Sequence, residues 1–500
     1  VLTDLEFYEI RYSGAPAAAV RAFRAVYLGL VFNCVIMATV TLAAVKISGI
    51  LFGLDRTTTI VFAGTLAVTF SVLSGLWGVV VPDLLLFVFA MTGAVAAAYF
   101  ALDHPAVGGL AGMLERLDAS RLAMLPDLGN WDLTLTVLII PLTIQWWSVW
   151  YPGAEPGGGS YIAQRILASK DERHAFGAVL WFNLAHYALR PWPWLIVALC
   201  SVIVYPTLGD IRAAFPDVEQ DLIGHDIAYP AMLKFLPSGF LGVMVGSLIA
   251  AYMSTMDTHL NWGASYLVHD LYRRFIRRDA SERHYVFVGR LVTAGLMVVA
   301  AGVVYVLASA KVGFDLMLSI GAGTGLIYLL RWFWWRINAW SEIAAMISSF
   351  LITVAVFVAN RWVLEEPLAT HVALLATVGV TTIVWITVTL LTAPADERTL
   401  VRFYRLIRPA GPGWRAIRKK AGLPASPDSL PTALLGWVLG CMFVYSGLFG
   451  TGHLLYGHAG LAVACAVPFA ASGVGLAILI PRFLRGPRTE GEAEVEDERP

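Results

Sequence analysis

The sequence predicts an all-α integral membrane protein with about twelve transmembrane helices in 500 residues. Hydrophobic residues make up 58% of the chain and charged residues only 14%, whereas soluble domains hold about 45–50% and 25%. The mean hydropathy is +0.70. With so few charges the chain cannot cover a water-facing surface, which excludes a soluble enzyme and a disordered protein. The 35 basic and 35 acidic residues balance, so no general attraction to nucleic acid is expected.

Each expected span is an apolar run near the length of about 20 residues that a membrane helix requires. Barrel strands are excluded because they would alternate over about ten residues. The expected spans are 20–47, 57–76, 78–102, 133–151, 174–205, 238–270, 286–309, 314–334, 339–359, 369–391, 431–455 and 458–481.

The distribution of lysine and arginine predicts the orientation. Alternating the twelve spans puts the segments richest in these residues, among them 273–283 and 398–420, on the side of the N-terminus. We therefore expect a multi-pass protein of the plasma membrane with both ends of this chain in the cytoplasm.

Motifs of enzymes and ATP-driven pumps are absent from the sequence. It contains no Gly-rich phosphate loop, no HExxH or GxSxG motif and no paired Cys/His cluster. The four cysteines are single and far apart, so no disulfide framework is expected. We expect neither enzyme activity nor an organic cofactor.

The sixth span carries polar residues that are costly inside a bilayer and are therefore functional candidates. Ala251, Ser254 and Thr255 share one helix face, and Ser254, Asp257 and Thr258 form an overlapping set. Hydroxyl, carboxylate and carbonyl oxygens are the ligands of a hard cation. The alternative for Ser254 and Thr255 is back-bonding to the preceding turn, but the carboxylate of Asp257 has no packing rationale at this depth.

Two further features suggest an ion or substrate site. Asp83 follows Pro82 in the third span, either as a second cation-binding carboxylate or as an ordinary helix-start aspartate. The prolines and glycines of 152–159 interrupt the fourth span around Glu155, and transporters place binding sites at such breaks. The alternative is a loop at the membrane edge. Trp146 and Trp147 suit either stacking on a substrate or an interfacial aromatic belt.

A polar stripe follows the fifth span. Its members are spaced at i, i+3, i+4 and i+7, which gives a polar lining about 10 Å long on one helix face. A histidine with satisfied hydrogen bonds in the interior is the ordinary alternative for one of them. The stripe consists of Asn183, His186, Tyr187 and Arg190.

Three segments together resemble the sodium/solute symporter family. They are AAYMSTMDTHLNWGASYLVHDLY (250–272), SYIAQRILASKDERHA (160–175) and TDLEFYEIRYSG (3–14). The resemblance implies a LeuT-type fold of two inverted five-helix repeats with extra helices. It also implies that the chain starts just before the third helix of the first repeat, without the first spans. The non-Met start is consistent with such a truncation.

The resemblance implies roles for individual residues. The Ala251 carbonyl, Ser254 and Thr255 match half of the family's sodium site. A second cation site of some members matches Asp83, Ser254, Asp257 and Thr258. Asp257 departs from the usual serine there, as do Pro82 and Leu86 from the residues usual beside the aspartate. His186 lies where some sugar-transporting members contact the substrate.

We therefore expect a sodium-coupled symporter that imports a small polar organic solute, with sodium, the solute and the bilayer as partners. Trp146, Trp147, Glu155, Asn183, His186, Tyr187 and Arg190 are the expected substrate contacts. Alternatives are proton coupling through Asp257, Asp83 or Glu155, a transporter-like membrane sensor and an inactive relative. The expected domains are a transporter core (1–391), a basic cytoplasmic linker along the headgroups (392–430), two accessory helices (431–482) and a charged tail (483–500).

Overall fold

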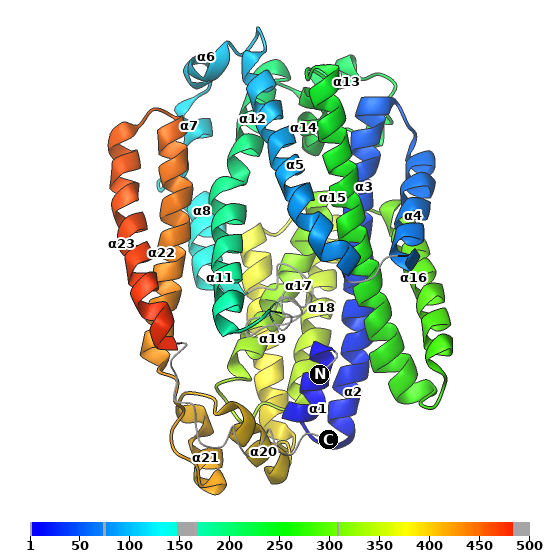
Figure 1. The fold of residues 1–500 in the computed structure, drawn as a ribbon, viewed down its shortest axis with the longest axis vertical. Coiled ribbons are helices and arrows are strands. Elements are labelled where there is room, and N and C mark those ends of the chain that lie inside the picture. Colours follow the sequence, from blue (N-terminus) through cyan, green and yellow to red (C-terminus); the bar gives the residue numbers. More distant parts are fainter. Residues whose placement is uncertain (1–2, 74–76, 148–165, 167–168, 308–309, 484–500) are drawn as a thin grey trace. The chain divides into compact units, whose positions relative to one another are not determined.

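The computed structural model describes residues 3–73, 77–147, 166, 169–307 and 310–483. Throughout these residues the regular elements are helices (Figure 1). Within this part of the chain ten helices are long and apolar enough to cross a membrane, and two shorter apolar helices cover Arg56–Val72 and Trp131–Thr143. The predicted all-helical membrane architecture is confirmed, whereas the exact number of crossings stays a prediction.

The chain divides into two compact units. Unit 1 comprises Val1–Gln164, Pro193–Leu329 and Arg336–Ala395, and unit 2 comprises Arg165–Trp192, Leu330–Trp335 and Asp396–Pro500. Unit 1 holds all of the residues that the sequence assigns to cation binding.

The main helices of unit 1 are α1 (Phe7–Arg11), α2 (Gly14–Val26), η2 (Tyr27–Phe32), α3 (Asn33–Phe52), α4 (Arg56–Leu73), α5 (Trp77–Asp103), α8 (Trp131–Thr134), η3 (Leu135–Ile139), α9 (Ile140–Thr143), η4 (Gln145–Trp147), α15 (Ser238–Ser265), η8 (Tyr266–Ile276), α16 (Glu282–Val304), α17 (Ala310–Leu330), α18 (Ala339–Trp362) and α19 (Thr370–Leu391). Short helices in its connections are α6 (Gly109–Arg116), α7 (Ala119–Leu122), α13 (Leu208–Ala214), η6 (Gln220–Leu222), η7 (His225–Ile227) and α14 (Ala228–Leu233).

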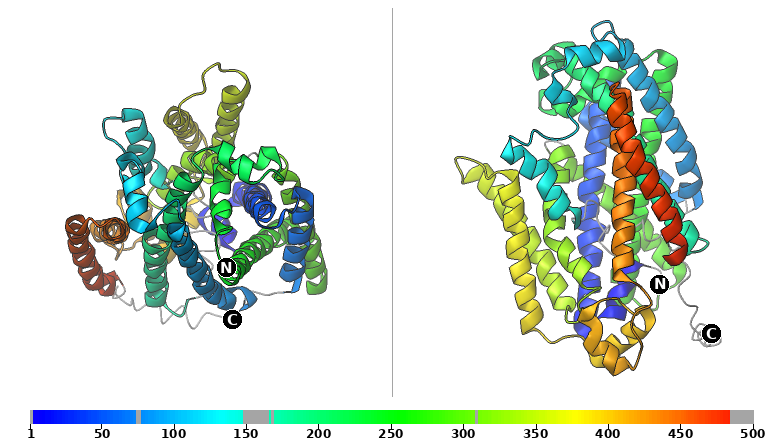
Figure 2. Two further views of the ribbon diagram at one scale, coloured as in Figure 1. Left: turned by 90° about the horizontal axis from the view of Figure 1, so that it is seen from above. Right: turned by 90° about the vertical axis from the view of Figure 1, so that its left-hand side faces the viewer.

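Unit 2 holds α11 (Glu172–Asn183), η5 (Leu184–Leu189), α20 (Glu397–Ile407), η9 (Pro412–Trp414), α21 (Arg415–Ala421), α22 (Leu430–Leu455) and α23 (Ala459–Phe483). Helix α12 (Pro191–Val204) continues from η5 into unit 1. Helices α22 and α23 pack side by side (Figure 2).

Local sequence explains where several helices begin and end. The side chain of Ser281 accepts a hydrogen bond from the His284 amide at the start of α16, which satisfies one of the free amides of the first turn. Asn338 caps α18 in the same way. Gly53 ends α3 with a φ of 67°, a left-handed conformation that favours glycine.

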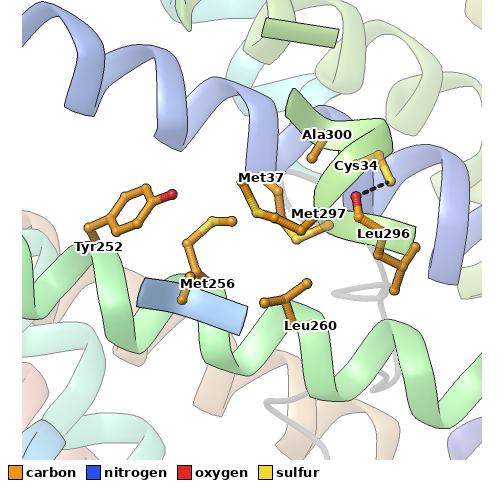
Figure 3. Packing of buried hydrophobic residues seen from close by; sticks show 9 residues of the cluster. Cys34, Met37, Tyr252, Met256, Leu260, Leu296, Met297 and Ala300 are labelled. Atoms are coloured by element: carbon orange, nitrogen blue, oxygen red, sulfur yellow. Dashed lines mark hydrogen bonds between the residues drawn. The ribbon is translucent and has the colours of Figure 1, made fainter. Parts of the chain in front are cut away.

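The core that packs around α15, the helix with the predicted sodium ligands, lies between α3, α15 and α16 (Figure 3). Its side chains are long and apolar, with three methionines that fill irregular space. The Cys34 thiol donates to the Leu296 carbonyl over 3.6 Å. The buried members are Cys34, Met37, Ala67, Tyr252, Met256, Leu260, Leu296, Met297 and Ala300.

The fourth predicted span differs from the expectation. Over 133–151 the described helix is short and irregular, with a π-helical stretch at Leu135–Ile139 and a 3₁₀ turn at Gln145–Trp147. The predicted break at 152–159, including Glu155, lies outside the described residues.

Candidate cation site

Helix α15 carries the three residues predicted to bind sodium. The helix runs without interruption from Ser238 to Ser265, so Ala251 and Thr255 lie one turn apart on the same face. The Thr255 Oγ1 donates a 2.9 Å hydrogen bond to the Ala251 carbonyl. This bond is the back-bonding to the preceding turn that was the alternative for Thr255, and it holds two hard oxygen atoms side by side. Ser254 is half-buried on the neighbouring part of that turn.

Ala251 and Thr255 both line a cavity of about 310 Å³ between α3, α4 and α15. Most of its wall is apolar, with residues such as Val40, Phe62 and Leu66. The Ser48 and Thr59 hydroxyls, at its edge, are 2.7 Å apart. The oxygen pair of α15 therefore stands at the wall of a mainly apolar space, where water competes weakly for a cation.

Asp257 is fully buried. Its Oδ1 accepts a 2.7 Å hydrogen bond from Asn261 Nδ2, one turn further along α15. Ser254 and Thr258, both half-buried, are its neighbours at helical spacing. The regular helix therefore brings Ser254, Asp257 and Thr258 onto adjacent positions, as the spacing predicts.

Helix α5, which carries Asp83, packs against α15 in the opposite direction. The rings of Phe100 and Phe240 are 5.3 Å apart, and a Cβ at Gly93 would lie 2.8 Å from Met244 Sδ. Moving toward the start of α5 therefore moves toward the end of α15 (Figure 1). Asp83 lies ten residues before Gly93 on α5, in the direction of the end of α15. The Asp83 side chain lies outside the described residues.

The two predicted aromatic contacts have different surroundings. Trp147 is half-buried, and its Nε1 donates a 3.2 Å hydrogen bond to the Ala322 carbonyl of α17. Trp146 is 45% exposed and donates to the Thr143 carbonyl of its own segment. Trp147 therefore joins its segment to α17, and the Trp146 ring packs edge-to-face against Trp147 with the ring centroids 5.6 Å apart.

The predicted polar stripe belongs to unit 2, and its last part is a π-helix, η5. Wider π turns do not keep the spacing of an α-helix, so the stripe divides into two pairs. His186 Nδ1 and Arg190 Nη1 are 3.0 Å apart, and the His186 ring stacks on Phe182 at 5.0 Å. Asn183 and Tyr187 instead line a groove against α22.

A buried ion-pair network connects the N-terminal segment to η8, the helix that continues α15. Asp270 has a fully buried side chain and Arg21 one that is 7% exposed, with Arg21 Nη2 and Asp270 Oδ1 2.6 Å apart. Arg21 Nη1 also contacts Glu9 Oε2 at 2.5 Å, and Glu9 contacts Arg274 at 2.9 Å. Thr3 donates to Asp270 over 3.0 Å.

The sequence analysis did not single out this network. An available signal was the presence of Arg21 near the start of the mainly apolar run 20–47, because a charge at depth requires a partner. A second overlooked contact is the hydrogen bond between Asn33 and His259, both buried. Asn33 Nδ2 also donates to the His259 carbonyl over 2.8 Å. A Cβ at Gly263 would lie 2.2 Å from Asn33 Nδ2 and 2.7 Å from the Gly29 carbonyl oxygen.

Metal chemistry beyond an alkali cation has little support in the described part of the chain. There, no group of three or more His, Cys, Asp or Glu residues is placed to hold a metal ion. The hydroxyl and carbonyl oxygens of α15 instead suit a hard cation such as sodium.

Comparison with known proteins identifies similar chains. The family model described as "Sodium:solute symporter family" matches residues 2–349. The sodium/glucose cotransporter of Vibrio parahaemolyticus is 26% identical over 303 residues, 57% of this chain and 54% of the relative. Sodium/myo-inositol cotransporter 2 of Rattus norvegicus is 28% identical over 327 residues, 58% and 46% respectively. The chain thus spans about half the length of the curated relatives it matches.

A solved structure described as the substrate-bound outward-open state of a Na⁺-coupled sialic acid symporter has a similar fold. The TM-score is 0.57, with 18% sequence identity over 79% of this chain and 78% of that chain. This likeness confirms the LeuT-type fold predicted from the three sequence motifs.

Proposed function

Because the chain belongs to the sodium:solute symporter family, we propose that it works as a sodium-coupled symporter that imports a small polar organic solute by alternating access. The carrying observation is the Thr255–Ala251 oxygen pair, held at 2.9 Å on the wall of a cavity. The names of the relatives support transport, and they support a transporter instead of an enzyme.

In this proposal sodium binds the Ala251 carbonyl, Thr255 Oγ1 and Ser254 Oγ. Binding requires Thr255 to rotate its proton away from the Ala251 carbonyl, so that both oxygens present lone pairs to the cation. A second cation binds Ser254, Asp257 and Thr258 together with Asp83. The antiparallel packing of α5 on α15 supports this second set, because the part of α5 that precedes Gly93 runs in the direction of the end of α15.

Sodium entry would supply the driving force. One charge moving through 100 mV yields about 2.3 kcal/mol, and a second coupled ion would roughly double this. The ion must bind the outward-facing and inward-facing states with different affinity, because equal affinity would shift nothing. We propose Trp146, Trp147, Glu155, His186 and Arg190 as candidate solute contacts. Asn183 and Tyr187, predicted together with them, instead line the apolar groove against α22.

A second candidate function is proton coupling in the same fold. It is favoured by the full burial of the Asp257 carboxyl within a candidate membrane span, a position at which carboxyl groups serve as proton carriers in transporters. Under this alternative, uptake would depend on pH and proceed without sodium.

The test compares thermal unfolding of the purified protein in sodium, potassium and choline chloride at equal ionic strength. Sodium at 100 times its Kd should stabilise the protein by about 2.7 kcal/mol. Thr255→Val should abolish this shift. Thr387→Val is the matched control, because Thr387 makes the same hydrogen bond to its own helix, 2.7 Å to Ile383. A sodium shift that survives in Thr255→Val, or that is lost equally in both variants, contradicts the proposed site.

A further inference from the structure

Unit 2 contains a wide groove of about 840 Å³ between α11–η5 and α22. The α22 residues that line it recur at intervals of three and four residues, so they form one face of the helix. From Ala433 to Leu448 this face is about 22 Å long at 1.5 Å per residue. The lining residues are Phe176, Val179, Leu180, Asn183, Tyr187, Ala433, Gly436, Trp437, Gly440, Cys441, Val444, Tyr445, Leu448 and Leu476.

The groove wall is suited to an apolar occupant. Its large side chains are aromatic or aliphatic, and Trp437 and Tyr445 are each about half exposed, at 52% and 50%. The amide of Asn183 is already engaged, since its Nδ2 donates a 2.8 Å hydrogen bond to the Val179 carbonyl. A polar solute would leave its own hydrogen bonds unsatisfied along most of this wall.

The groove widens toward the starts of its two helices. The closest approach lies at Gly447, where a Cβ would be 3.3 Å from Ala188 Cβ and 3.5 Å from Leu184 Cδ1. From this contact the lining continues back to Phe176 on α11 and Ala433 on α22. The groove, about 22 Å long, therefore covers about three quarters of a hydrocarbon core 30 Å thick, which is long enough for the acyl chain of a lipid in one leaflet.

A folded cationic hairpin stands at the wide end. Helices α20 and α21 pack together (Figures 1 and 2). A connection of eight residues, 422–429, joins α21 to α22. The Phe403 and Trp414 rings stack 5.5 Å apart inside the hairpin. Trp414 Nε1 donates to the Trp332 carbonyl over 2.8 Å, which ties the hairpin to the preceding segment of the unit.

The outer face of this hairpin is basic. Arg398, Arg402 and Arg405 follow one face of α20 at helical spacing and are exposed, as is Arg415 at the start of α21. Among the described residues, no acidic side chain within ion-pair distance is recorded for these four arginines. Unpaired arginines at the end of a membrane helix attract anionic headgroups.

We propose that unit 2 binds an anionic phospholipid, with an acyl chain in the α11–α22 groove and the phosphate against the arginines of α20 and α21. The occupant follows from the two halves together, because an apolar groove long enough for an acyl chain leads to a patch of positive charge. A bidentate guanidinium is well suited to a phosphate. The site is separate from the cation residues of α15, which belong to unit 1.

The test uses brominated lipids, which quench nearby tryptophan. The protein is reconstituted with brominated phosphatidylglycerol or brominated phosphatidylcholine, and the Trp437 signal is the difference between the protein and its Trp437→Phe variant. We expect stronger quenching by phosphatidylglycerol. Gly440→Leu should remove it by filling the groove, since a Cβ at Gly440 meets open space. Gly460→Leu on α23, equally open, is the matched control and should leave the quenching unchanged.

The headgroup half is tested with Arg402→Gln and Arg405→Gln. Each arginine should contribute about fivefold to the preference for the anionic lipid, while the exposed Arg212 of unit 1 should contribute nothing as Arg212→Gln. Folding of each variant is checked by circular dichroism and elution volume. Equal quenching by the two lipids, or none by either, would overturn the proposal, the latter because another occupant, such as a second copy, fills the groove. Thermal stabilisation by soluble glycerol phosphate equal to that by phosphatidylglycerol would also overturn it, in favour of a free-anion site.

Discussion

At the scale of single residues, the charges of the Arg21–Asp270 network depend on one another. Both side chains are nearly or fully buried and lie 2.6 Å apart. A buried pair of this kind contributes little relative to an apolar pair of the same shape, but the loss of one partner leaves an uncompensated charge. The network therefore makes single substitutions costly at two positions that lie far apart in the sequence.

Arg21→Gln should destabilise the protein by about 3–5 kcal/mol, because Asp270 would lose its cationic partner. The measurement is denaturant or thermal unfolding in detergent. The exposed Arg283 serves as the control through Arg283→Gln, which should be nearly neutral. The double variant Arg21→Gln/Asp270→Asn should lose less free energy of unfolding than the two single variants lose when their losses are added. Strict additivity would show that the pair is not coupled.

Glu9 makes the same network sensitive to pH. Burial raises the pKa of Glu9. The hydrogen bonds and positive charges of Arg274 and Arg21 lower this pKa by a larger amount, so the net pKa lies below its usual value. A depressed pKa contributes stability that is complete above the unfolded-state pKa of about 4.3. This contribution is lost as the pH falls through the lower folded-state value.

Thermal stability should therefore decline below about pH 4.3, and part of the decline should vanish in Glu9→Gln. The control is Glu282→Gln, because Glu282 is exposed and pairs only at the surface with Arg273. If the pH profile of Glu9→Gln coincides with that of the unmodified protein, Glu9 is not a source of the acid sensitivity.

At the scale of elements, α15 packs tightly against α3 and η2 at Gly263. At Gly263 the backbone comes so close to α3 and η2 that an added Cβ would lie 2.2 Å from Asn33 Nδ2 and 2.7 Å from the Gly29 carbonyl. The hydrogen bonds of Asn33 to His259 fix the same level of the helix. Thr255, a predicted sodium ligand about two turns earlier on α15, is thereby held in a defined position relative to α3.

Gly263→Ala should destabilise the protein by about 1–3 kcal/mol through overpacking. Gly242→Ala on the same helix is the matched control, since a Cβ there meets nothing within 4 Å. The control should be neutral or stabilised by up to about 1 kcal/mol through helix propensity. Sodium-induced stabilisation measured on both variants shows whether the displaced helix also weakens the ion site. Equal unfolding temperatures for the two variants would contradict the close approach.

At the scale of the whole molecule, the sequence was sufficient to predict the long helices, but not which residues of different helices contact one another. Apolar run length predicted the long spans, and helical spacing predicted that Ser254, Asp257 and Thr258 occupy adjacent positions. Hydropathy could not predict that Arg21 meets Asp270, because this contact joins residues 249 positions apart. Nor could it predict the π turns at Leu184–Leu189, which separate Asn183 and Tyr187 from the His186–Arg190 pair.

The basic stretch 392–430 illustrates the same limit. Its charge predicted a linker along the headgroups, and that orientation remains a prediction. Its fold depends on Phe403 and Trp414 meeting across a turn, a contact that composition does not encode. The groove between α11 and α22 was likewise beyond the sequence, since it arises from the packing of helices about 250 residues apart.

The separation of Arg21 and Asp270 also has a consequence for biosynthesis. At about 5–20 residues per second, a ribosome requires roughly 12–50 s to synthesise the stretch between them. During this time the span with Arg21 near its start must reside at the translocon or membrane surface with Glu9 as its carboxylate partner, before Asp270 exists. A chaperone or a temporary anionic neighbour would stabilise this intermediate, and an arrested nascent chain ending before residue 270 should be more susceptible to proteases than a chain ending after it.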